Sequence, residues 1–363
     1  MPTASEPTES RASAPATVAG FVRDRLVWLL LATYALAAVV PAPGIWLQQL
    51  GVPDTDPGQP VSTAVRFSLV MVGVLLLCGA LSVDVGKLRE LIQRAGGLAL
   101  ALLGVAFPPV LVVAGWGIAA TAWLTPTDAT ALAVGLALAG AMPVANSAVA
   151  WTHQSGGSLA WALGLVVLSI CLCPWVAPGL LQVMGLTLSA ADADQANLLV
   201  SRFTGAIFLV WVLGPTLIGL GIRTALGAAT IRAARHVLTL VSAAALLLLN
   251  YANAATALPR VFAEPDWTLL GTTLIAAATL PIAGVAVARM LARLAGVSRH
   301  AALAWSYALG MKNTGLALGL AGATLGDRPI VVVTILAVTL TQHFVAGVVH
   351  AWQTKISDVA PER

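Results

Sequence analysis

The chain has 363 residues, of which 59% are hydrophobic and only 9% are charged, against about 25% charged residues in soluble domains. This composition excludes a soluble protein and indicates an integral membrane protein, so the lipid bilayer is its first expected partner. The formal net charge of +4 does not indicate a nucleic-acid partner, because the arginines fall in short loops and form no basic patch.

The N-terminal segment differs in composition from the rest of the chain. Residues 1–22 are rich in Pro, Ser, Thr and Ala, and we expect them to form a disordered cytoplasmic tail. Arg23 and Arg25 then precede the first apolar run. A cleaved signal peptide is an alternative interpretation of this short run, but the count of helices favours its retention.

Apolar windows of membrane-spanning length follow one another along the whole chain. A bilayer core about 30 Å thick requires about 20 apolar residues per helix. The windows lie at about 26–42, 63–83, 96–123, 129–152, 159–186, 198–222, 236–258, 268–292, 300–324 and 330–352. Lys and Arg are concentrated in alternate connections, which predicts a multi-pass protein of the cell (inner) membrane with both termini cytoplasmic.

Ten spans divide into two halves of five, and an odd-numbered unit that is repeated once must be inverted in the membrane. We therefore predict an all-α fold with repeat 1 at residues 23–190, repeat 2 at 191–355 and a cytoplasmic tail at 356–363. Interrupted helices in matching places of two such halves indicate the substrate site of a secondary transporter. The fourth and ninth windows are both interrupted.

The two interruptions supply the candidate site residues. The fourth window reads ALAGAMPVANSAVAW and the ninth reads ALGMKNTGLALG. Proline and glycine break the helix there, and the freed backbone groups must face protein or a wet cavity. The polar and helix-breaking residues of the two windows are Pro143, Asn146, Ser147, Gly310, Lys312, Asn313 and Thr314.

The same segments carry a resemblance to a known family. The ninth window contains Ala308-Leu-Gly-Met-Lys-Asn-Thr-Gly315, the tenth contains His343-Phe-Val-Ala-Gly347, and the fourth contains Pro143-Val-Ala-Asn-Ser-Ala-Val149 followed by THQSGGS. In these motifs the chain resembles the bile acid:sodium symporter family. The resemblance implies that the fourth and ninth helices cross, that a core domain moves against a panel domain, and that the substrate is a small organic anion. Bile-acid-like, keto acid and pantothenate-type carboxylates are the classes it implies.

The chain departs from that family at the positions that hold sodium in sodium-coupled members. The third window has no Gln, and every Asp and Glu of the chain falls in a tail, a loop or the edge of a helix. Hard cations require oxygen ligands, usually with a carboxylate among them. We therefore expect the sodium site to be lost and no metal or other cofactor to be present. The positions that correspond to the family's ligands are Ala308, Lys312, Ala148, Val149, Ala162 and Val166.

Lys312 takes the place of a sodium-binding Gln in the resemblance. A lysine that faced lipid would cost about 3 kcal/mol or more, so we expect it to face the interior and to find oxygens. Half-helix carbonyls, Asn146, Ser147, Asn313 and Thr314 are the candidates. The hypothesis is that its ammonium group replaces the coupling cation. Two alternatives remain open: burial disfavours the charged form, so the lysine could carry a transported proton, or it could extend to the end of the helix.

Other polar residues of the windows have weaker interpretations. Asn250 and Asn253 lie on one helix face and either bond neighbouring helices or line the cavity. His343 is expected to hydrogen-bond to a broken helix. The three cysteines lie in apolar runs and indicate packing residues. No enzyme motif is present, so the rival to a transporter is a membrane receptor or scaffold. The sequence does not indicate the oligomeric state.

Overall fold

The computed structural model describes residues 18–22, 25–50, 67–82, 95–185, 209–325 and 328–359. Most of the predicted N-terminal tail lies outside these residues, and residues 18–22 are helical. The last helix continues to Val359, so the start of the predicted C-terminal tail is helical. Apolar residues of the tenth window simply run on into a polar stretch that keeps the helical conformation.

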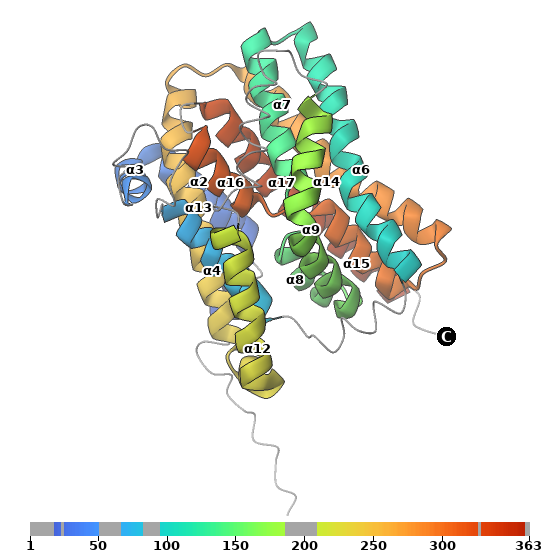
Figure 1. Cartoon of the computed structure of the whole chain (residues 1–363). Helices are drawn as coiled ribbons and strands as arrows, with labels where there is room; N and C mark the ends of the chain where they lie inside the picture. The colour runs from blue at the N-terminus through green and yellow to red at the C-terminus, as the bar shows by residue number, and fades with distance from the viewer. Residues whose placement is uncertain are drawn as a thin grey trace, which may run out of the picture.

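The described part of the chain is built from helices (Figure 1). Helix is present within each of the ten predicted windows, although the start of the 198–222 window lies outside the described residues. The α-helices are α2 (Leu26–Val39), α3 (Ala42–Gln49), α4 (Phe67–Leu81), α6 (Ala95–Ala119), α7 (Pro126–Ala141), α8 (Ser147–Gln154), α9 (Leu159–Gly185), α12 (Gly214–Ala233), α13 (Arg235–Ala263), α14 (Trp267–Leu294), α15 (Arg299–Gly310), α16 (Thr314–Thr324) and α17 (Pro329–Val359).

Six helices of the described residues are long and apolar enough to cross a membrane: α6, α9, α12, α13, α14 and α17. The pair α2 and α3, which is bent by 94°, would make a seventh if it counts as one span. The fourth and ninth predicted spans are each divided into two half-helices, α7 with α8 and α15 with α16. These breaks are where the sequence places them.

Local sequence accounts for the positions of the breaks. Helix α7 ends at Ala141, and Met142 is extended (φ −67°, ψ 151°) because a residue that precedes proline avoids the helical region. Helix α15 ends at Gly310, after which Met311 is extended (φ −124°, ψ 118°). The side-chain oxygen of Asn313 then accepts a hydrogen bond from the backbone N–H of Leu316 at 3.1 Å, which caps the first turn of α16.

The helices pack in two groups. Helices α2, α3, α4, α12 and α13 contact mainly one another and form what we call the α13 group, whereas α6, α7, α8, α9, α14, α15 and α17 form the α14 group. Figure 1 shows α12, α4 and α13 on one side of the molecule and α6, α14 and α15 on the other. Helix α16 contacts α4 and α13 on one side and α17 on the other.

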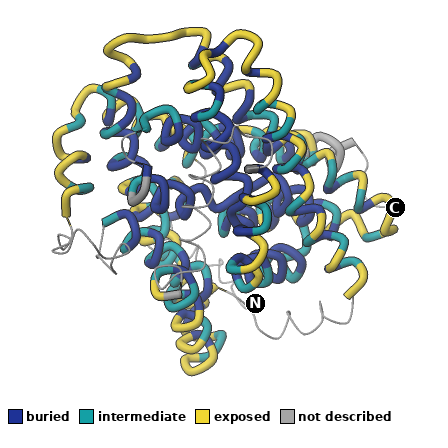
Figure 2. Tube along the Cα trace, turned by 45° about the horizontal axis from the view of Figure 1, so that its top comes forward, coloured by how far each residue is buried: buried dark blue, intermediate teal, exposed yellow. Residues whose placement is uncertain are grey.

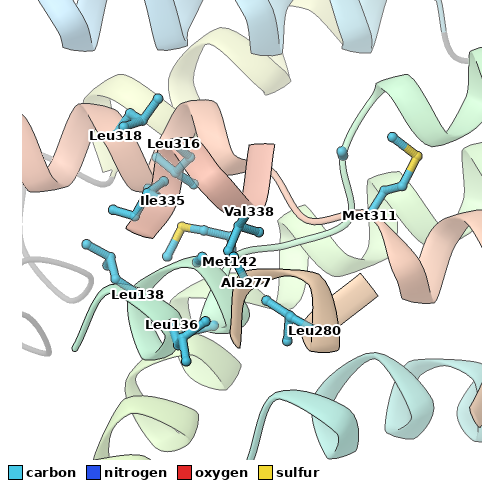
Figure 3. Close-up of a cluster of buried hydrophobic side chains, with 14 of the residues drawn as sticks. Leu136, Leu138, Met142, Ala277, Leu280, Met311, Leu316, Leu318, Ile335 and Val338 are labelled. Carbon is cyan, nitrogen blue, oxygen red and sulfur yellow. The ribbon is translucent and has the colours of Figure 1, made fainter. Parts of the chain in front are cut away.

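Burial follows the pattern expected for a protein in lipid. The buried residues are concentrated in the interior, and exposed residues lie around them (Figure 2). Large apolar side chains remain exposed at four-residue spacing along α6, namely Leu103, Phe107 and Leu111. An apolar outer face of this kind is stable against hydrocarbon. The first residues of the two breaks, Met142 and Met311, belong to one buried apolar cluster (Figure 3).

Candidate functional site

The two breaks pair with each other through their backbones. Val144 and Lys312 form an antiparallel β-bridge. The N–H of Ala145 donates to the carbonyl oxygen of Met311 at 3.0 Å, and the N–H of Asn313 donates to that of Pro143 at 2.8 Å. Each break therefore satisfies backbone groups of the other, as groups in a low-dielectric interior require. The half-helices meet at this crossing.

Polar side chains of two further helices complete the crossing. The N–H of Val144 donates to Ser169 Oγ of α9 at 3.0 Å. The N–H of Lys312 donates to Gln342 Oε1 of α17 at 2.9 Å, and Gln342 Nε2 donates to Thr314 Oγ1 at 3.3 Å. Sequence reasoning missed both Ser169 and Gln342. For Gln342 the available signal was an amide side chain in an apolar span, which is unfavourable there unless it has hydrogen-bond partners.

The side chain of Lys312 points into the protein and is only 2% exposed, so the prediction that it faces the interior holds and the alternative that it extends to the helix end is wrong. Its Nζ donates to the carbonyl oxygen of Val105 in α6 at 2.6 Å. This partner was not among the oxygens expected from the sequence. It comes from the third predicted span, which has no Gln.

The Val105 carbonyl is available to Lys312 because the residue four positions later in the helix has no N–H. In an α-helix this oxygen would accept from the N–H of the residue four positions later. That residue is Pro109, which lies inside α6 and has no N–H. The proline thus leaves an acceptor in the middle of the helix, and the lysine uses it.

A cavity of about 450 Å³ lies between the two helix groups and reaches the crossing. Its walls come from α4 and α13 on one side and from α8, α9 and α17 on the other. The volume is typical of a small-molecule site, the walls are mainly apolar, and the described lining contains no Asp or Glu. Six of the residues selected from the sequence line it: Asn146, Ser147, Lys312, Asn313, Thr314 and His343.

The other residues selected from the sequence do not line the cavity, and their contacts are structural. Pro143 follows the end of α7, and its carbonyl oxygen accepts the hydrogen bond from the N–H of Asn313. Ala308 is fully buried. At Gly310 an added Cβ would come within 2.9 Å of Val285 Cγ2, so this glycine allows α15 to approach α14 closely. Asn253 donates to the carbonyl of Leu249 in its own helix at 2.8 Å.

His343 does not bond to a broken helix, so that expectation is wrong. Its Nδ1 lies 2.8 Å from the carbonyl oxygen of Thr339 in the same helix, and because a carbonyl only accepts, Nδ1 carries the proton. Its Nε2 is buried and has no partner among the described residues. Asn250 does bond helices together, since it accepts a hydrogen bond from Tyr34 Oη of α2 at 2.9 Å.

Asn146 links the first break to the opposite helix group. Its Nδ2 donates to the carbonyl oxygen of Leu75 in α4 at 3.2 Å. The same side chain lies against Gly79, where an added Cβ would collide with it. The first break therefore contacts α4 at the cavity through one amide that packs against one glycine.

Comparison with known proteins agrees with this architecture. A search of curated proteins found no match to the chain. The model of the SBF-like CPA transporter family matches residues 24–351, which is most of the chain and contains both breaks and every residue named in the site. The chain therefore belongs to the SBF-like CPA transporter family, which is of the bile acid:sodium symporter type, and is a multi-pass membrane protein.

Proposed function

We propose that this protein is a secondary transporter of small organic anions that works by alternating access. The observation that supports it most directly is the position of the cavity, which lies between two helix groups and reaches the crossing of the half-helices. A movement of the α14 group against the α13 group would change the side from which this cavity is reached. The function of a receptor or scaffold does not require such a crossing of half-helices.

The chemistry of the cavity favours an amphipathic carboxylate. The apolar walls suit a hydrocarbon body, while Lys312 supplies the cationic group and the described lining has no acidic side chain to neutralise it. Bile-acid-like, keto acid and pantothenate-type anions meet this description. An anion that lost its hydration against apolar walls alone would be strongly unfavourable, so the site needs a polar end of this kind.

Matching contacts in the two halves support ten spans in two inverted repeats, at residues 23–190 and 191–355. Ser169 in the fifth span and Gln342 in the tenth bind the two N–H groups of the bridge. Pro281 of α14 leaves the carbonyl of Ala277 free, and Thr341 Oγ1 donates to it at 3.2 Å. This repeats what Pro109 does in α6. The distribution of Lys and Arg supports an inner-membrane protein with cytoplasmic termini.

We further propose that transport does not require sodium and that Lys312 replaces the coupling cation. The supporting contact is the one from Nζ to Val105, because a carbonyl that is free of helical bonding is a ligand that a hard cation would use. A second candidate is a proton-coupled transporter. It is favoured by His343 Nε2, a buried nitrogen on the cavity with no partner among the described residues.

The test is counterflow uptake into proteoliposomes with radiolabelled organic anions of the three classes. Sodium is replaced by choline, and each condition is measured at two pH values. We expect uptake without sodium. Lys312→Gln retains a donor but removes the charge, and we expect it to lower uptake at least about tenfold, which corresponds to about 1.4 kcal/mol. Arg260→Gln removes an exposed charge from the end of α13 and should leave uptake unchanged.

The other outcomes are distinguishable. A requirement for sodium would reject the role of Lys312 and leave the transporter assignment in place. Uptake without sodium that disappears when the pH gradient is removed would establish the proton-coupled alternative. Failure of every anion under every gradient, with protein that is folded in the liposomes, would favour a receptor.

A further inference from the structure

A second cavity, of about 240 Å³, lies where the turn between α14 and α15 meets the C-terminal part of α17. It shares no lining residue with the transport cavity. Arg289, Arg293 and Arg299 line it, and no Asp or Glu does so among the described residues. The like charges of Arg289 and Arg293 repel each other, so an anion between them would stabilise the arrangement.

Arg289 has a guanidinium nitrogen without a hydrogen-bond partner among the residues that the structure describes. Its guanidinium carbon lies 4.3 Å from the centre of the Trp352 ring, a contact that holds the planar group in one orientation. Its Nη2 is buried and has no hydrogen-bond partner in the described part of the chain. A buried donor without an acceptor is unfavourable, whereas a guanidinium group binds the paired oxygens of a phosphate or carboxylate well.

The residues around this cavity favour a position near lipid headgroups. Trp352 of α17 lines it and is half exposed, and Met290 and Leu294, which follow Arg289 and Arg293 in α14, are exposed apolar residues. Tryptophan is enriched at the membrane–water interface, and basic pockets between membrane helices bind the headgroups of anionic lipids. Arg299 stands at the edge, where its Nη2 donates to Gln353 Oε1 at 3.1 Å.

We propose that the cavity lined by Arg289, Arg293 and Arg299 binds a phosphate group, and that the phosphate belongs to an anionic membrane lipid. The shared chemistry is a phosphate ester that fits a free organophosphate as well as a lipid. The half-exposed ring of Trp352, which lines the cavity, is what favours the lipid. This site is separate from the proposed transport function and does not depend on it.

Native mass spectrometry of the full chain in neutral detergent tests the proposal. Phosphatidylglycerol and phosphatidylcholine of the same acyl chains are titrated separately, and inorganic phosphate is titrated in a thermal unfolding assay. We expect phosphatidylglycerol to bind at least about tenfold more tightly than phosphatidylcholine. Arg293→Gln, at an exposed position, and Arg289→Gln should each weaken phosphatidylglycerol binding about tenfold, which corresponds to the loss of a charge-assisted hydrogen bond.

Two controls make the result decisive. Arg232→Gln removes an exposed arginine from the end of α12 and should leave lipid binding unchanged. Arg289→Lys retains the charge but not the planar fork, and should bind with intermediate affinity even if Arg289→Gln fails to fold. Equal binding of the two lipids, or wild-type binding by Arg293→Gln, would overturn the proposal. Protection by inorganic phosphate that Arg293→Gln abolishes, without a preference for phosphatidylglycerol, would retain the phosphate site and reject the lipid.

Discussion

The two helix breaks have the same backbone pairing but different side chains. At the break between α7 and α8, the bridging residue is Val144 and its N–H binds the hydroxyl of Ser169. At the break between α15 and α16, the bridging residue is Lys312 and its N–H binds the amide of Gln342. A crossing of this geometry thus needs a polar partner for each N–H but needs no charge. The charge at the second break is therefore available for function.

The two breaks also differ in what their asparagines contact. Asn313 caps α16 and so contributes to the fold of its own helix. Asn146 makes no cap for α8, and its side chain reaches Leu75 in the α13 group. The first break thus contributes a hydrogen bond to the α13 group, and the second carries the charged group.

The largest expected effect comes from a substitution that blocks the contact between Asn146 and α4 at the first break. In Gly79→Leu the new side chain collides with Asn146, so the two groups cannot approach as they do here. We expect counterflow uptake to fall to background. Gly115→Leu in α6 is the matched control, because nothing lies within 4 Å of a Cβ there. Normal uptake by Gly79→Leu would show that this contact is not part of the transport cycle.

The partners of the bridge allow a direct comparison of the breaks. Gln342→Leu leaves both the Lys312 N–H and Thr314 Oγ1 without their partner. Ser169→Ala leaves the Val144 N–H without its partner, whereas the Val166 carbonyl, which Ser169 also contacts, lies inside α9 and can accept from the helix itself. Each buried group that loses its partner costs about 1–3 kcal/mol. Equilibrium unfolding in detergent should therefore show a larger loss of free energy for Gln342→Leu. The reverse order would show that the hydroxyl at the first break contributes more than the amide at the second.

A substitution in α6 tests whether the charge at the second break needs its carbonyl. Pro109→Ala restores an N–H that can bond to the Val105 oxygen, and this N–H competes with Lys312 Nζ. We expect uptake to fall several-fold while the helical content of the protein stays the same or rises, because alanine favours helix far more than proline. Unchanged uptake would mean that Lys312 functions without this acceptor.

Sequence reasoning could predict the elements of this fold because they depend on local chemistry. Apolar runs located the helices, and Pro143 with Gly310 located the breaks. The burial of Lys312 followed from the cost of exposing it to hydrocarbon. These conclusions need only the residues within one or two helical turns.

The partners at the crossing depend on tertiary contacts that no local pattern specifies. The two atoms of the bond from Lys312 Nζ to Val105 belong to residues 207 positions apart, and the acceptor is a backbone carbonyl that any residue type could supply. Ser169 was missed because the family resemblance directed attention to Ala162 and Val166. The prediction for His343 was wrong because it considered only partners on other helices, whereas the carbonyl of Thr339 in its own helix is within reach.

The attachment of Lys312 Nζ to the backbone has a consequence for bioenergetics under the proposed function. A sodium ion dissociates after translocation, whereas a covalently attached ammonium group must return with the empty carrier. In its charged form it makes that return step sensitive to membrane voltage, by up to about 2.3 kcal/mol for each elementary charge that crosses 100 mV. The loaded carrier, with a monovalent anion beside the lysine, would move without net charge. Voltage would then control turnover through the empty protein.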